Sequence, residues 1–366
     1  MESEQDSIRG RGASSNPANR FELIHYERDE MVEETESPSP ATRFYRDHSR
    51  SVLTYNDSPD VGFEVGINPY RGCEHGCVYC FARPTHEYLG FSAGLDFETK
   101  IMVKEDAPAL LRKELSATKW QPKVVALSGV TDPYQPIERR LGLTRRCLEV
   151  FAEFRNPVGV VTKNHLICRD TDLLVELAQH RAAAAFLSIT TLDAELARRM
   201  EPRATHPASR LAAIEELTRA GVPVGVLVAP VIPGLNDYEI PAILEAAAKA
   251  GARSAGYVLL RLPHGLGPLF EQWLQQHYPD RCEKVLSRLR EMRGGAMYDA
   301  RFGSRMRGEG AMAEQIASLF ALARRRAGIP ERSPALSTAS FRRPNGTQRL
   351  LFDMVQEQPN TGSAST

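Results

Sequence analysis

Three of the six cysteines lie within eight consecutive residues, and their spacing is the strongest chemical signal in the chain. Cys73, Cys77 and Cys80 form a C-x3-C-x2-C pattern. Gly72 and Gly76 allow sharp turns between them, because glycine adopts positive φ angles without a Cβ clash. Three thiolates so close together can converge on one iron-sulfur cube. Such a cube leaves one iron without a protein ligand, just as a catalytic zinc ion keeps one coordination position open.

A structural zinc ion is the alternative interpretation of the same cysteines. Structural zinc sites have four protein ligands, so one more ligand would have to come from elsewhere in the chain. His75 and His86 are the nearest candidates. A histidine this close in sequence to the cysteines is more often an ordinary loop residue than a metal ligand.

The cysteine pattern, with the aromatic Tyr79 before its last cysteine, resembles the signature of the radical S-adenosylmethionine (SAM) superfamily. The resemblance implies a [4Fe-4S] cluster on Cys73, Cys77 and Cys80, with SAM bound to the open iron. It also implies reductive cleavage of SAM to a 5′-deoxyadenosyl radical that abstracts a hydrogen atom from a substrate. An electron donor such as flavodoxin or ferredoxin would then be a partner.

Residues 62–265 are similar to the spore photoproduct lyase-like branch of that superfamily. The similarity implies that Ser128 contacts the SAM amino group, Lys163 its carboxylate and Ser188 its ribose. Phe81 stands where the backbone of the family meets adenine.

One position departs from that branch. Spore photoproduct lyase has a cysteine near the end of the second strand that returns a hydrogen atom to the substrate, whereas this chain has Ala126 and Leu127 there. Tyr134 is the candidate hydrogen donor in its place. Radical-based repair or modification of a nucleic-acid base is therefore one alternative for the function. A non-catalytic metal-binding regulatory module is an alternative from another class.

Six short apolar segments alternate with longer amphipathic segments. We predict strands at 63–67, 124–127, 158–161, 186–189, 222–228 and 257–260, and helices that include 104–117, 173–178, 207–220 and 238–250. Strands that are continuously apolar are typical of a parallel sheet covered by helices. This pattern predicts an α/β fold but does not separate a barrel from a doubly wound sheet. The family resemblance implies a partial (β/α)6 TIM-like barrel.

Polar residues directly follow the second, third and fourth predicted strands, at 128–138, 162–165 and 188–191. The C-terminal ends of the strands form the ligand site of a parallel α/β barrel. We therefore expect these residues and the cysteines to form one SAM pocket. Taken singly, each segment would also fit a turn, a helix cap or a solvated loop.

Arginines separated by glycines follow the sixth predicted strand, at Arg261, Arg301, Arg305 and Arg307. Guanidinium groups bind phosphate and carboxylate well, so an anionic substrate is one interpretation. An ordinary charged surface loop is the other.

Both ends of the chain are polar, with the composition of solvated segments. We predict a disordered or extended N-terminal arm over 1–55, the partial barrel over 56–265, a helical lid extension over 266–330 and a disordered tail over 331–366. Residues 21–26 and 350–352 are apolar enough to dock on the main domain.

The balance of charged residues limits the kinds of molecule that the protein could bind. The 46 Lys and Arg residues balance 46 Asp and Glu residues, so only a local basic face could bind nucleic acid. The first thirty residues have no signal-peptide core, and prolines interrupt the longest apolar run, 222–235. We expect a monomeric, cytoplasmic protein without a membrane segment, in which Cys147, Cys168 and Cys282 are unpaired thiols.

Overall fold

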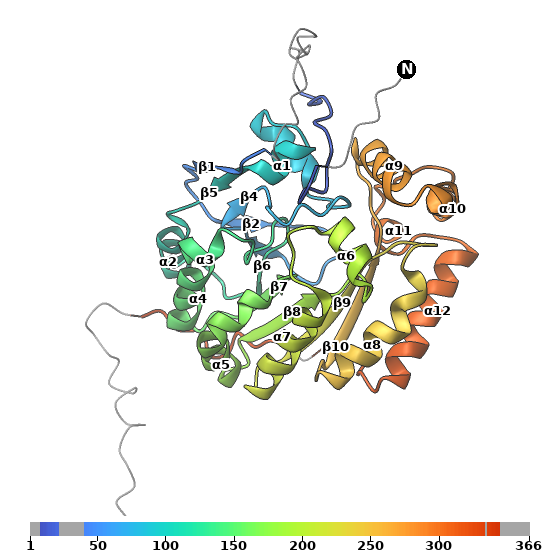
Figure 1. The fold of residues 1–366 in the computed structure, drawn as a ribbon. Helices are drawn as coiled ribbons and strands as arrows, with labels where there is room; N and C mark the ends of the chain where they lie inside the picture. The colour runs from blue at the N-terminus through green and yellow to red at the C-terminus, as the bar shows by residue number, and fades with distance from the viewer. Residues whose placement is uncertain (1–7, 22–39, 334, 345–366) are drawn as a thin grey trace, which may run out of the picture.

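The centre of the molecule is a seven-stranded sheet with the strand order β10-β9-β8-β7-β6-β3-β2 (Figure 1). The structure is a computed structural model that describes residues 8–21, 40–333 and 335–344. Neighbouring strands from β3 to β10 pair in parallel, and β2 pairs with β3 in the antiparallel direction. The strands are β2 (Leu53–Tyr55), β3 (Val65–Ile67), β6 (Val125–Leu127), β7 (Val158–Thr162), β8 (Ala183–Ser188), β9 (Val224–Val231) and β10 (Ser254–Leu259).

Six parallel strands in chain order confirm the predicted α/β fold and distinguish it from a doubly wound sheet, where the strand order reverses at a switch point. Each of these strands overlaps a predicted apolar segment. In the described part of the chain β10 and β2 form the two edges of the sheet. The sheet is therefore open between them, as in a partial barrel.

Helices connect the parallel strands on the outside, as parallel pairing requires. The helix patterns are confirmed, and α7 and α8 stop just before Gly221 and Gly251, whose φ angles are 94° and 105°. The connecting helices are η1 (Arg83–Leu89), α1 (Leu95–Thr99), α2 (Ala107–Ser116), α3 (Glu138–Leu141), α4 (Leu143–Phe154), η2 (His165–Asp170), α5 (Thr171–Gln179), α6 (Ala194–Met200), α7 (Pro207–Arg219), η3 (Asp237–Glu239) and α8 (Ile240–Lys249).

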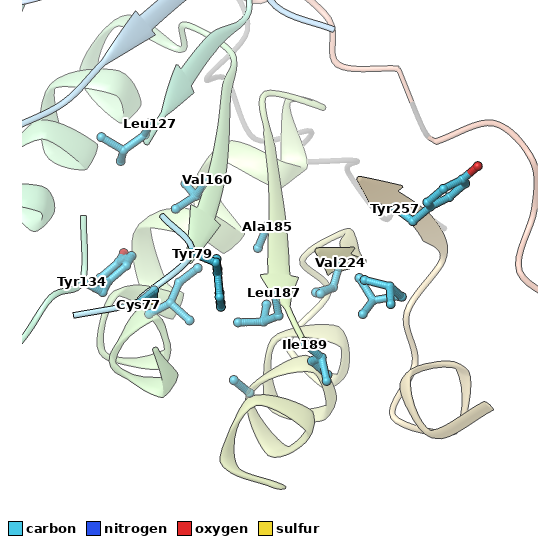
Figure 2. Close-up of a cluster of buried hydrophobic side chains, with 14 of the residues drawn as sticks. Cys77, Tyr79, Leu127, Tyr134, Val160, Ala185, Leu187, Ile189, Val224 and Tyr257 are labelled. Carbon is cyan, nitrogen blue, oxygen red and sulfur yellow. The ribbon is translucent and has the colours of Figure 1, made fainter. Parts of the chain in front are cut away.

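Apolar side chains from successive strands fill the core. Figure 2 shows Leu127, Val160 and Leu187 from three neighbouring strands, with Cys77 and Tyr79 beside them. Three residues of the cysteine loop (residues 72–82), Cys77, Val78 and Tyr79, are thus part of the hydrophobic core. The core fixes the position of this loop relative to the strand ends.

The N-terminal segment covers the cysteine loop. The backbone N–H groups of Gly12 and Ala13 donate to the Glu98 carboxylate at 3.1 and 2.9 Å. A Cβ atom at position 12 would lie 1.7 Å from the Gly76 carbonyl oxygen, so only glycine fits against the loop. This part of the expected arm is therefore packed on the domain, while most of the apolar stretch 21–26 lies outside the described residues.

A second, smaller sheet lies beside the cysteine loop. It has the order β1-β5-β4 and consists of β1 (Arg43–Arg46), β4 (Tyr70–Arg71) and β5 (Lys100–Val103). Its strands β1 and β5 are parallel, so residues 43–46 of the expected arm are also held by the main domain.

The C-terminal extension packs along the β10 side of the sheet. It contains α9 (Leu266–His277), α10 (Pro279–Glu291), α11 (Ser304–Arg307) and α12 (Ala311–Arg326), with α12 against α8 and α11 against β10 (Figure 1). Gly303 N–H donates to Asp60 at 2.6 Å, and the Arg305 guanidinium pairs with the same carboxylate. Asp60 belongs to the loop between β2 and β3, so the extension bridges the two edges of the open sheet.

Residues 335–344, in the region expected to be a disordered tail, dock on α4. The Phe341 and Phe154 rings are 6.3 Å apart, and Arg342 N–H donates to the Phe154 carbonyl at 2.9 Å. The apolar stretch 350–352 lies outside the described residues. In the described ranges, every helix is too short or too polar to span a bilayer.

Candidate active site

The buried side chain of Arg83 organises the cysteine loop. Its Nε donates to the Cys77 carbonyl at 2.9 Å, and its Nη2 donates to the Gly76 carbonyl at 3.2 Å. The Glu98 carboxylate lies 2.5 Å from the same guanidinium, and both side chains are completely buried. Because Glu98 also accepts bonds from Gly12 and Ala13, one ion pair fixes the loop and the segment that covers it. The sequence analysis missed this pair.

A second set of hydrogen bonds ties the cysteine loop to the segment after β6. Glu74 N–H donates to the Gln135 side chain at 2.9 Å, and Gln135 Nε2 donates to the Gly72 carbonyl at 3.3 Å. The Glu74 carboxylate accepts from Ile137 N–H at 2.7 Å and pairs with Arg203 at 3.0 Å. The polar segment 128–138 therefore helps to position the cysteines.

The three cysteines of the loop are reduced and mostly buried: Cys73 and Cys77 are 7% exposed and Cys80 is half-buried. Burial raises the pKa of all three thiols, so thiolates at these positions need a cation beside them. Iron ions would supply that charge.

The spacing of the sulfur atoms argues against a single zinc ion. Among the described residues, the one group of three metal-ligating side chains with all donor atoms within 4.8 Å of one another does not include these cysteines. Because Zn–S bonds are about 2.3 Å, a tetrahedral zinc would hold its sulfur ligands about 4 Å apart. A cluster holds each sulfur on a different iron, so wider spacing fits a cluster better.

Both histidines considered as zinc ligands have other partners. His75 Nδ1 is 3.3 Å from the Asp132 carboxylate, and its Nε2 is 3.3 Å from the Asn164 amide nitrogen. His86 Nε2 is 2.9 Å from the Lys100 carbonyl, and burial lowers the pKa of His86 to about 4. These contacts favour structural roles for both rings.

Asp132 connects the cysteine loop to the end of β7. Its carboxylate accepts from the Thr162 hydroxyl and from Lys163 N–H, each at 2.7 Å, and it lies beside His75. Burial alone would raise the pKa of Asp132, but His75 and these donors hold it below its usual value. Asp132 thereby fixes the backbone of Lys163.

The Lys163 side chain turns toward the cysteine loop and is mostly buried. Its Nζ is 3.3 Å from the Thr190 hydroxyl, the Ala229 carbonyl and the Glu201 carboxylate. It also lies 5.6 Å from the centre of the Tyr79 ring. The predicted residues Lys163 and Thr190 are therefore brought together with the cysteine loop.

Glu201 is a fully buried carboxylate that the sequence analysis missed. It pairs with Arg210 and Lys163 and accepts hydrogen bonds from the hydroxyl groups of Tyr79 and Thr190. Burial alone would raise the pKa of Glu201, but Arg210 and Lys163 hold it well below its usual value. Two cations around one carboxylate leave a surplus positive charge here, which favours an anionic ligand group.

The other expected SAM contacts lie at the same strand ends. Ser128 follows β6 with a φ angle of 95°, and such strain in a non-glycine residue is concentrated at functional sites. Its hydroxyl donates to the Thr131 carbonyl at 3.0 Å. Ser188 is the buried last residue of β8, and its carbonyl accepts from Arg210 at 3.0 Å. The Phe81 ring, adjacent to Cys80, is 46% exposed.

Tyr134 is held by the outer helices. Its side chain is completely buried, and its hydroxyl donates to the Asp170 carboxylate at 3.1 Å. Burial, followed by the charge of Asp170, raises the pKa of Tyr134 well above its ordinary value. This geometry gives the hydroxyl a structural partner and offers no support for Tyr134 as the hydrogen donor.

Comparisons with known proteins decide the family. A family model of the radical SAM superfamily matches residues 67–247. The uncharacterized protein Rv2578c of Mycobacterium tuberculosis is 39% identical over 232 residues, which cover 63% of this chain and 67% of that protein. The chain belongs to the radical SAM superfamily. As a radical SAM protein it is an enzyme, and the alternative of a non-catalytic regulatory module is set aside.

Other radical SAM proteins extend the comparison. The radical SAM Nα-GlyT isomerase of Pseudomonas phage M6 is 22% identical over 260 residues, which cover 70% of this chain and 52% of that protein. A solved spore photoproduct lyase with bound AdoMet and dinucleoside spore photoproduct has a TM-score of 0.51 and 17% identity, over 78% of this chain and 77% of its own. The shared architecture confirms the fold that the sequence resemblance implied.

The arginines after β10 fall into two groups in this radical SAM enzyme. Arg301 pairs with Asp299 at 2.8 Å and with Glu309 at 3.1 Å, and Arg305 pairs with Asp60. The chain's own carboxylates thus pair with these two guanidinium groups, which favours the alternative of an ordinary charged surface loop at Arg301 and Arg305.

Arg261 and Arg307 instead lie over aromatic rings. The guanidinium carbon of Arg261 is 5.2 Å from the centre of the Phe81 ring, and that of Arg307 is 4.1 Å from the Tyr257 ring. Neither forms an ion pair with a described residue, and Arg261 Nε is buried without a hydrogen-bond partner there. The Arg261 Nη1 donates to the Met306 sulfur at 3.5 Å, so the charge of Arg261 has no carboxylate partner in the described part of the chain.

Proposed function

We propose that this enzyme binds one [4Fe-4S] cluster through Cys73, Cys77 and Cys80 and cleaves SAM reductively at the C-terminal ends of its strands. The observation that carries the proposal is the buried cysteine loop, held on the core by Arg83 and bordered by the Lys163–Glu201–Arg210 group. When reduced, such a cluster supplies the electron that cleaves SAM to methionine and a 5′-deoxyadenosyl radical.

The chain's own residues would bind SAM and keep water away from it. The surplus positive charge at Lys163 suits the SAM carboxylate. Ser128 would contact the amino group and Ser188 the ribose, while the backbone at Phe81 would meet adenine. Because the cysteine loop is packed on the core and covered by residues 8–21, the reacting groups would be largely shielded from solvent.

We also infer a one-electron donor such as flavodoxin or ferredoxin as a partner, because the reaction consumes one electron for each SAM cleaved. A reducing, cytoplasmic location would keep the six free cysteines reduced. We expect the enzyme to act as a monomer.

Anaerobic reconstitution with iron and sulfide tests the proposal. We expect about four iron atoms per chain, as in a [4Fe-4S] cluster, and formation of 5′-deoxyadenosine from SAM after reduction with dithionite. A protein that holds one zinc ion and forms no 5′-deoxyadenosine would overturn it.

Replacing Lys163 with alanine should weaken SAM binding roughly 10- to 150-fold, because a hydrogen bond to a charged group contributes about 1.5–3 kcal/mol. The measurement is equilibrium binding of SAM to the reconstituted protein. Lys104→Ala is the matched control, since it also removes a buried lysine. SAM affinity that stays the same in Lys163→Ala would remove the carboxylate assignment.

Radical chemistry on a nucleic-acid base is the second candidate function. The observation that favours it is the Phe81–Arg261 pair, because an aromatic ring beside a guanidinium without a carboxylate partner among the described residues can bind a base and a phosphate together. The Arg261→Gln variant, which removes the cation, should bind fluorescent single-stranded oligonucleotides several-fold more weakly than the parent protein.

Arg301→Gln is the control for that experiment, because Arg301 also follows β10 in the chain but pairs with the chain's own carboxylates. Fluorescence anisotropy at several salt concentrations measures the binding. An equal loss in both variants would mean that any anion binding is non-specific. Absence of binding by the parent protein would remove the nucleic-acid hypothesis.

A further inference from the structure

His165, Cys168 and Glu216 form a second group of metal-ligating side chains, which plays no part in the proposed SAM chemistry. It is the one such group of three among the described residues whose donor atoms all lie within 4.8 Å of one another. His165 and Cys168 lie just beyond the end of β7, and Glu216 lies on α7, which packs against them. They are distinct from the cysteine loop in sequence and in position.

Local structure brings the three side chains together. His165 and Cys168 are three residues apart on η2, and a 3-10 helix has three residues per turn, so both lie on one face. Glu216 is on α7, which packs against η2. The backbone before the group is also fixed, because the Thr205 hydroxyl accepts from His165 N–H at 3.3 Å and donates to the Lys163 carbonyl at 2.8 Å.

The donor atoms already have nearly the spacing that a metal requires. His165 Nε2 is 3.4 Å from the Glu216 carboxylate, and the Cys168 sulfur lies within 4.8 Å of both donor atoms. In a tetrahedral zinc site with bonds of about 2.0–2.3 Å, neighbouring donor atoms lie about 3.3–3.8 Å apart. Small side-chain movements would therefore place one ion in contact with all three residues.

The types of donor atom narrow the choice of metal. One sulfur, one imidazole nitrogen and one carboxylate oxygen are typical zinc ligands, whereas calcium and magnesium prefer oxygen ligands only. Three protein ligands leave the fourth position to water, so the site would be open, unlike the closed four-ligand sites typical of structural zinc. His165 and Glu216 are 40% and 48% exposed, so an ion can reach the site from solvent.

We propose that His165, Cys168 and Glu216 bind a zinc ion that links η2 to α7. The two elements flank the proposed SAM site, because Lys163 lies two residues before η2 and Arg210 is on α7. Through its three protein ligands, the ion links the segment that follows Lys163 to the helix that carries Arg210. The other interpretation of these residues is a surface His–Glu ion pair with a neighbouring thiol.

The test uses the full chain with its iron-sulfur cluster reconstituted, so that the cluster cysteines are occupied. The protein is freed of loose metal, incubated with one equivalent of Zn²⁺ and separated from unbound ions. Elemental analysis then gives zinc and iron per chain. The expected result is one zinc per chain in the parent protein. Cys168→Ser and His165→Gln should bind zinc more weakly than the parent, by more than the roughly 10- to 100-fold loss that is typical when a residue that only supports a metal ligand is replaced.

Cys282→Ser and His180→Gln are the matched controls, because they remove the same residue types elsewhere, and both should retain zinc. With Co²⁺ in place of zinc, a sulfur-to-cobalt charge-transfer absorption is expected in the parent and absent in Cys168→Ser. Failure of the parent to bind zinc, or zinc binding that is unchanged in Cys168→Ser, would overturn the proposal. Iron content and 5′-deoxyadenosine formation, measured on the same samples, test the proposed function separately.

Discussion

Replacing Cys77 with alanine is expected to abolish iron binding and the formation of 5′-deoxyadenosine. Cys77 is buried on the core beside Tyr79, and two remaining thiolates cannot hold a cube that needs at least three protein ligands. Iron and sulfide per chain and chromatographic assay of 5′-deoxyadenosine after anaerobic reduction measure the effect. We expect a fall to the level obtained without enzyme.

The control for this variant is Cys282→Ala, which removes a buried cysteine from α10, far from the loop in sequence. It should keep the parent's iron content and product yield. Iron retained at the parent level by Cys77→Ala would contradict the assignment of this cysteine. Iron lost equally from both variants would indicate general unfolding, which circular dichroism of the same samples would reveal.

Replacing Arg83 with methionine is expected to lower the free energy of unfolding by about 3–5 kcal/mol, the usual cost of leaving one partner of a buried ion pair uncompensated. Glu98 would stay buried without its guanidinium partner, and the carbonyl groups of Gly76 and Cys77 would lose their donors. Urea unfolding of the cluster-free protein measures the change. The same variant should lose iron after reconstitution, because Arg83 shapes the cysteine loop.

Two further variants provide controls for Arg83→Met. The double variant Arg83→Met with Glu98→Leu should be less destabilised than Arg83→Met alone, since no buried charge remains unpaired. Removal of an exposed pair by Arg219→Met should cost no more than about 1 kcal/mol, because surface salt bridges contribute little. If Arg83→Met were as stable as the parent protein, the result would show that Arg83 does not organise the cysteine loop.

The Lys163–Glu201–Arg210 group changes how the SAM site is understood. The family resemblance implies that Lys163 alone contacts the SAM carboxylate. In the structure it already pairs with Glu201, which Arg210 also neutralises. In the proposed SAM site the group as a whole, rather than one side chain, would supply the positive charge.

The sequence by itself determined the features that depend on local spacing. The cysteine pattern requires only a short loop with flexible glycines, and the alternation of apolar strands with amphipathic helices reflects which faces must be buried. These signals were sufficient for the family, the parallel α/β fold and the strand ends where the polar residues gather. Glycine at the ends of α7 and α8 is a signal of the same local kind.

Only the tertiary structure decided which charged groups meet. Arg83 and Glu98, or Arg305 and Asp60, are separated along the chain, and no periodic pattern connects them. Their pairing depends on how loops from different strands pack, because a buried charge is stable only where another part of the fold supplies its partner. For the same reason the sequence did not reveal that residues 8–21 cover the cysteine loop. The cysteine spacing thus determined the chemistry of the loop, and the folded chain determined what surrounds and supports it.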